Sequence, residues 1–103
     1  MLLLNINYVP DRKIQALGIV KGSVVMSKNF GKDFMAGMKT LVGGEIEGYT
    51  ELLQQARQIA TKRMVDEAER MEADAVISVT YTSSSVMQGA AEVTAYGTAV
   101  KLI

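Results

Sequence analysis

The sequence contains no cysteine and no histidine. Without these residues there can be no disulfide, no thiolate nucleophile, no imidazole base and no ordinary zinc or copper site. The absence of cysteine also agrees with a reducing compartment. Because most familiar catalytic groups are missing, we expect that the protein is not an enzyme. We assign no catalytic residue and no metal ligand, and the sequence leaves any cofactor and its binding residues unidentified.

Charge of one sign is not in excess, since eleven basic residues are balanced by eleven acidic ones. A protein that neutralises several phosphates or coats an anionic membrane carries a basic surplus. Long hydrophobic runs are absent as well. Asn5 interrupts the run that starts at Met1, far short of a signal peptide or of the ~20 residues that span a bilayer. We therefore expect a cytoplasmic protein with neither nucleic acid nor membrane as a partner.

The chain has 103 residues, of which 49% are apolar, and it contains no linker or internal repeat. This composition fits a single folded domain over residues 1–103. At its start, Leu2–Tyr8 is predicted to form a short edge strand. The pair Pro10–Asp11 then supplies the chemistry of a turn.

A second strand is predicted over Ile14–Met26, because this segment is rich in β-branched residues. Gly18 and Gly22 lie four residues apart and therefore share one face of such a strand. A face with two glycines lets another backbone approach closely or allows the strand to bend.

Two helices are predicted in the middle of the chain. The first covers 30–41, with Asn29 as its cap and Gly43–Gly44 as the turn that ends it. The second runs from Gly48 to Glu72 and has the strongest periodic signal in the sequence. Its apolar residues recur every three or four positions: Leu52, Leu53, Ala56, Ile59, Ala60, Met64, Ala68 and Met71. The opposite face is polar and has the spacing of surface ion pairs, Lys62 with Asp66 and Asp66 with Arg70.

The last third of the chain is predicted to be a hairpin. Ile77, Val79 and Tyr81 alternate with polar residues and should share one buried face. A loop at 87–90 leads into a final strand over 91–102. The order strand, helix, helix, strand, strand indicates a two-layer α+β fold, with the long helix on one face of an antiparallel sheet. Since the other face is left uncovered, we expect a homo-oligomer.

Several polar and aromatic residues are candidates for a site, and each has a plainer explanation. The segment Gly43–Gly48 precedes a helix, but it lacks the lysine and hydroxyl pair of a phosphate-binding loop, and a turn with a helix cap is favoured. Asp33, Glu45 and Glu47 could bind a hard cation, although solvated carboxylates are the more common case.

The remaining candidates lie on the long helix, the hairpin and the short helix. Tyr81 and Tyr96 could stack on a planar ligand, but packing against each other across the strands is favoured. Arg57 could form an ion pair with a carboxylate of a neighbouring subunit, more readily than it would clamp a substrate. Met35 and Met38 could offer thioethers to a soft metal, while core filling is the plainer role.

An ordered set of residues carries a resemblance over nearly the whole chain. The set comprises Gly18–Gly22, Asn29, Asp33, Gly43–Gly44, Tyr49, Ala56–Arg57, Ala60, Ala73–Val76, Tyr81 and Gly97–Val100. With these spacings the chain resembles the YbjQ-like family, which carries a heavy-metal-binding label. The resemblance implies a dodecin-like subunit with strand order 1-3-2, assembled as a ring, most simply a pentamer. Relatives tend to have glycine where this chain has Ala73. Because the chain has neither cysteine nor histidine, we do not assign the family's heavy-metal-binding role to any of its residues.

Three functions remain open at this stage. The first is a non-enzymatic, ring-forming protein that binds a small ligand or ion at clefts between subunits or in a central channel. The second is an enzyme that uses only carboxylates, Arg57 and tyrosine hydroxyls. The third is a soft-metal sensor based on methionine. The missing catalytic residues and the incomplete sheet cover favour the first.

Overall fold

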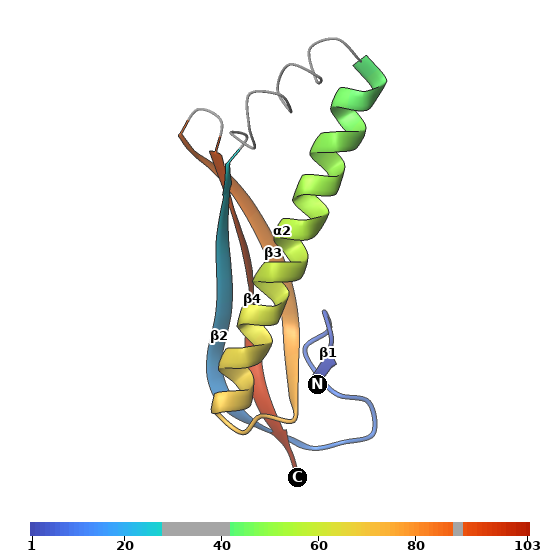
Figure 1. The fold of residues 1–103 in the computed structure, drawn as a ribbon. Helices are drawn as coiled ribbons and strands as arrows, with labels where there is room; N and C mark the ends of the chain where they lie inside the picture. The colour runs from blue at the N-terminus through green and yellow to red at the C-terminus, as the bar shows by residue number, and fades with distance from the viewer. Residues whose placement is uncertain (28–41, 88–89) are drawn as a thin grey trace.

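The computed structural model describes residues 1–27, 42–87 and 90–103, with the side chains of the helix described from Thr50 onward. Over these residues the fold is α+β and consists of one long helix and a four-stranded sheet (Figure 1). In chain order the elements are β1 (Leu2–Leu3), β2 (Ile14–Ser27), α2 (Val42–Arg70), β3 (Ala75–Met87) and β4 (Ala90–Leu102). The short helix predicted over 30–41 lies outside the described residues.

The sheet has the strand order β1-β3-β4-β2. Its three long strands are antiparallel and place β4 between β2 and β3, which is the predicted order 1-3-2. The prediction of a purely antiparallel sheet is wrong, however, because β1 pairs in parallel with β3. Since β1 and β2 run in the same direction at opposite edges, the chain between them must cross the sheet.

The crossing segment consists of residues 4–13, between β1 and β2, and it replaces most of the predicted strand Leu2–Tyr8. Beyond β1 it follows β3 through single hydrogen bonds: the Leu4 amide donates to the Val76 carbonyl at 2.9 Å, and the Ser78 amide donates to the Ile6 carbonyl at 2.9 Å. The predicted turn is confirmed, since the Arg12 amide donates to the carbonyl of Val9 at 3.2 Å. The segment therefore leaves β3 after Ile6 and turns back toward β2.

A β-bulge divides β3 into two parts. Ser78 has a φ of 54° and the pairing with β4 shifts between Ile77 and Thr80. Because one extra residue exchanges the two faces of a strand, Ile77 and Val79 point to opposite sides of the sheet. Ile77 packs in a small cluster with Val9, whereas Val79 belongs to the core under the helix. The prediction that Ile77 and Val79 share one face is therefore wrong.

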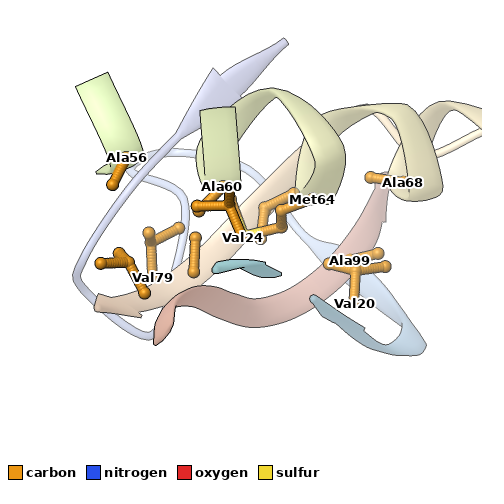
Figure 2. Packing of buried hydrophobic residues seen from close by; sticks show 11 residues of the cluster. Val20, Val24, Ala56, Ala60, Met64, Ala68, Val79 and Ala99 are labelled. Carbon is orange, nitrogen blue, oxygen red and sulfur yellow. The ribbon is translucent and has the colours of Figure 1, made fainter. Parts of the chain in front are cut away.

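The main core lies between α2 and the sheet. The buried helix positions follow one another at intervals of four residues: Leu52, Ala56, Ala60, Met64 and Ala68. Figure 2 shows the three alanines and Met64 directed toward the strands, where Val20, Val24, Val79 and Ala99 meet them. The buried stripe is narrower than predicted, because Ile59 remains 36% exposed. Small side chains along this stripe allow the helix to lie close to the sheet.

Gly22 marks the closest approach of the helix to β2, as the two glycines predicted. A Cβ atom at this position would collide with the Ala60 carbonyl oxygen and the Met64 amide nitrogen, and would lie 2.7 Å from the Arg63 Cβ. The Arg63 guanidinium also donates to the Ser23 carbonyl at 2.6 Å. Helix and strand are thus in direct backbone contact at this point.

The two ends of α2 differ from the prediction. The helix begins at Val42, so Gly43–Gly44 lie inside its first turn and do not form the predicted turn. The cost of about 1 kcal/mol for each glycine in a helix is small enough to be overridden by tertiary context. At the other end, the Glu72 and Ala73 amides donate to the carbonyls of Glu69 and Ala68, with Glu72 at φ 59°. This is a Schellman ending whose left-handed residue is Glu72 and not Ala73.

The sheet face away from the helix is partly covered, and not open throughout as predicted. Val9 from the crossing segment is 6% exposed and packs with Ala75, Ile77 and Val100. Farther along the strands the same face is open. Its exposed side chains include Ile19 and Val25 on β2 and Tyr96 on β4.

Candidate functional site

A shallow groove lies on the helix side of the molecule, between α2 and the part of β3 beyond the bulge. Its lining residues are Gln54, Arg57, Gln58, Thr61, Lys62 and Tyr81. The groove exists because α2 lies mainly over β2 and β4 and makes few contacts with β3. Tyr81 is carried to the helix side by the bulge, and it faces the outer flank of the helix across the space that α2 leaves open.

A chain of hydrogen bonds fixes one wall of the groove. The Thr61 hydroxyl donates to the Arg57 carbonyl at 2.6 Å, and its oxygen lies 2.7 Å from the Tyr81 hydroxyl. A threonine hydroxyl has a single hydrogen, so Tyr81 must be the donor in the second bond. The Tyr81 oxygen therefore keeps its acceptor capacity free while its ring is held against the helix.

The charges of the groove are unequally compensated. Lys62 and Asp66 form the ion pair that the sequence predicted, at 3.2 Å, whereas the described residues contain no ion pair between Asp66 and Arg70. The Arg57 guanidinium has neither a hydrogen bond nor an ion pair within the described part of the chain. Arg57 is also exposed. The groove thus offers one uncompensated guanidinium and the amide groups of two glutamines.

Tyr81 and Tyr96 do not pack against each other as predicted. Tyr81 is opposite Ala95, and Tyr96 is opposite Thr80 on one side and Lys21 on the other. Ala95 belongs to the core under the helix, so Tyr81 lies on the helix face and Tyr96 on the other. No surface joins the two rings, and only Tyr81 takes part in the groove.

The other sequence candidates lie outside the residues whose side chains the structure describes. Asp33, Met35 and Met38 lie outside the described residues, so their proposed roles are untested. Glu45 and Glu47 lie in the first turns of α2, where only the backbone is described. A helical backbone there rules out a glycine-rich phosphate loop at Gly43–Gly48.

The described residues do not form a heavy-metal site of the usual thiolate, imidazole or carboxylate kind. Cysteine and histidine are absent from the sequence. In residues 1–27, 42–87 and 90–103, aspartates and glutamates nowhere gather as three side chains that could hold an ion. Soft metals prefer thiolate, thioether and imidazole ligands, and of these the described surface supplies only the thioethers of exposed methionines such as Met1 and Met87.

Sequence reasoning identified Arg57 and Tyr81 separately but missed that they share a site. It also missed Gln54 and Thr61. A signal was present, because Gln54 and Gln58, and likewise Arg57 and Thr61, are four residues apart and therefore lie side by side on a helix. What the sequence could not show is which strand faces them.

A search of the helices in the described residues finds none long and apolar enough to cross a membrane. The charged and amide side chains around the groove, Arg57, Lys62 and Gln58, lie on the one long helix of this part of the chain.

A family model and individual relatives both identify the same family. The YbjQ family model, described as "Putative heavy-metal-binding", matches residues 1–103. The chain is 53% identical to a UPF0145 protein of Clostridium novyi, with full coverage of both chains. It is 59% identical to a UPF0145 protein of Fervidobacterium nodosum, covering 99% of this chain and 95% of the relative. A Thermus thermophilus UPF0145 protein is 54% identical, with 99% and 90% coverage.

One solved structure shows the same fold. It is the crystal structure of a protein with unknown function from Pediococcus pentosaceus, described as a member of the DUF74 family. The TM-score is 0.65 at 14% sequence identity, and the match covers 100% of this chain and 98% of the other. At this identity the likeness concerns the fold alone.

Proposed function

The chain belongs to the YbjQ family of UPF0145 proteins, and from that premise we propose that it is a non-enzymatic, ring-forming protein that binds a small ligand at clefts between its subunits. The proposed subunit is dodecin-like and the proposed ring is a pentamer. The proposed location is the cytoplasm. Its proposed partners are further copies of itself, and neither nucleic acid nor a membrane.

The observation that carries this proposal is the exposure of the outer half of β3. Every residue from Thr80 to Met87 is exposed, although the strand has two faces and a helix lies on one side of the sheet. A strand needs burial of at least one face to contribute to stability, and an isolated two-stranded hairpin is at best marginally stable in water. A second subunit would supply the missing cover.

The edge of this strand supports the same proposal. β1 pairs only with Ala75 and Val76, so the β3 edge from Thr80 to Met87 has no neighbouring strand among the described residues. The segment 80–87 contains no charged residue and no proline. Proteins usually protect a free strand edge with charges, prolines or bulges. A register shift between Ser85 and Met87 interrupts the far end of this edge, but the stretch from Thr80 to Ser85 has none of these protections and is suited to association.

The dimensions of the chain agree with a subunit that is incomplete alone. The Cα radius of gyration is 16.8 Å. A compact chain of 100 residues has a radius of gyration of about 13 Å. An elongated chain buries less of its own surface, and exposed apolar side chains such as Ile19, Val25 and Met87 are consistent with this.

The alternatives have weaker support. A soft-metal sensor would depend on methionine thioethers alone, and Met35 and Met38, the two methionines on which it is based, lie outside the described residues. An enzyme based on carboxylates would need acidic side chains held in an apolar setting, and the described structure buries no charged residue. Asp33→Asn would test the enzyme alternative in a screen of generic substrates, where turnover lost in the variant would favour an enzyme over a binding protein.

The proposal is tested by the native mass of untagged protein purified from cells. We expect a mass of five chains, about 56 kDa from the 11.2 kDa of one chain, with an added small mass if the ligand is retained. As a variant, Val86→Lys places a charge on the exposed edge half of β3, and it should shift the mass toward smaller species. Gln55→Lys, at an exposed position of the helix, adds the same single charge and serves as the matched control. A wild-type protein that is a monomer at micromolar concentration would refute the ring.

A further inference from the structure

We propose that the groove between α2 and β3 binds a small monoanionic carboxylate that also carries a hydroxyl group, that is, a hydroxy acid. The inference rests on the proposed ligand-binding function and names the class of ligand. Because Tyr81 belongs to the half of β3 that a second subunit is proposed to cover, the groove would be one wall of a cleft between subunits. It is argued from the donors, the acceptor and the net charge that Arg57, Gln54, Gln58 and Tyr81 present to the groove.

The carboxylate would bind to the guanidinium of Arg57. Arginine presents its N–H groups as a planar fork that matches the two oxygens of a carboxylate. Within the described residues this fork has no protein partner, while the other cation of the groove, Lys62, is held by Asp66. One uncompensated positive charge fits a monoanion better than a dianion such as hydrogen phosphate.

The glutamine side chains provide further donors without adding charge. Gln54 and Gln58 line the same wall of the groove as Arg57, on α2. Each amide can donate two hydrogen bonds and accept others, so both can serve the carboxylate or polar atoms of the ligand body. An exposed arginine alone binds anions weakly, and these neighbours are what would hold the ligand in one orientation.

The hydroxyl group of the ligand would donate to Tyr81. Because the Thr61 hydrogen is used on the Arg57 carbonyl, the Tyr81 hydrogen is used on Thr61, and only acceptor sites remain on the Tyr81 oxygen. A simple carboxylate has no hydrogen to offer to this oxygen, whereas a hydroxy acid has one. The direction of a hydrogen-bond chain thus selects between two otherwise similar ligands.

Lactate and propionate test this selection, since they differ only by the hydroxyl group. Each would be titrated into protein labelled with ¹⁵N at arginine, and the dissociation constant read from the Arg57 side-chain signal. We expect lactate to bind about threefold to tenfold more tightly than propionate, the range for one added hydrogen bond. In Tyr81→Phe the two affinities should become equal while that of propionate is unchanged.

Two arginine variants control for general charge effects. The affinity of each variant for lactate is measured by equilibrium dialysis. Arg57→Gln should weaken lactate binding about tenfold or more. Arg70→Gln removes an exposed arginine from the last turn of the same helix, outside the groove, and should leave lactate binding unchanged.

Three results would overturn the inference: equal affinities of lactate and propionate for the wild type, equal effects of the two arginine variants, or tighter binding of inorganic phosphate than of lactate. The native mass of each titrated sample is measured in parallel. A monomeric mass would refute the ring, whereas the lactate preference decides the ligand class in either state of assembly, so the two failures can be told apart.

Discussion

Replacing Gly22 by alanine is expected to destabilise the fold more than any comparable change of one methyl group. The added Cβ would collide with the Ala60 carbonyl oxygen and the Met64 amide nitrogen, and would lie 2.7 Å from the Arg63 Cβ. None of these atoms is the end of a flexible side chain, so the helix itself must move away from β2. Overpacking costs about 1–3 kcal/mol, and backbone contact places Gly22→Ala at the upper end, about 3 kcal/mol.

The free energy of unfolding would be measured by urea denaturation followed by circular dichroism, at one fixed protein concentration because association contributes to stability. For a domain of this size, 3 kcal/mol corresponds to a decrease of about 12 °C or more in the midpoint of thermal unfolding. Lys21→Ala, on the exposed face of the same strand, should change the stability by less than about 0.5 kcal/mol.

A second substitution separates backbone from side-chain collision. Ala60→Gly shortens the side chain beside Gly22 but leaves the Ala60 carbonyl where it is. If the collision is with the helix backbone, Ala60→Gly should not rescue Gly22→Ala, and the double variant should be no more stable than Gly22→Ala alone. Rescue of Gly22→Ala by Ala60→Gly, or a Gly22→Ala protein as stable as the wild type, would refute the proposed contact.

Three further changes test local features by the same denaturation assay. Glu72→Gly should raise the stability by about 0.5 kcal/mol, because glycine adopts the left-handed φ of 59° without steric cost. This gain should exceed the entropy cost of fixing a glycine that is freer in the unfolded chain. A loss of stability would contradict the Schellman ending. Asn5→Ala should cost about 1 kcal/mol through the lost bond from its side-chain amide to the Val79 carbonyl at 3.1 Å, and hydrogen exchange at Val79 should accelerate. Lys62→Met should change the stability by less than about 0.5 kcal/mol, because its ion pair with Asp66 is 76% and 42% exposed; a larger loss would show that the pair is not merely on the surface.

The sequence predicts the main layers of the fold because their patterns are long and regular. The repeating apolar positions of α2 locate the helix and the alternation in the last third locates the hairpin, as the structure confirms. The prediction at Gly22 succeeds for a different reason, since a glycine in a strand has few explanations other than close approach. These signals are local, and each is carried by the residues that adopt the structure.

The features that escaped prediction depend on partners far away in the sequence. The residue type at Ser78 does not predict a left-handed backbone, since serine is common in strands. The bulge is visible only in the pairing of β3 with β4. The two residues of β1 are too few to show a direction, so its parallel pairing could not be foreseen. The groove escaped in the same way, because a polar helix face with Arg57 and Gln58 is typical of simple solvation.

The topology of the sheet has a consequence for folding during synthesis. β2 pairs only with β4, and β1 pairs only with β3, so no strand in the described first half of the chain has its partner nearby. Until residues beyond 75 have emerged from the ribosome, only α2 can form with local contacts. At about 5–20 residues per second the N-terminal strands wait several seconds for their partners, which is ample time for β2, with Lys21 as its single charged residue, to meet another chain. Rapid docking of the last hairpin, more than the stability of any early intermediate, would then decide how much of the newly made protein folds correctly.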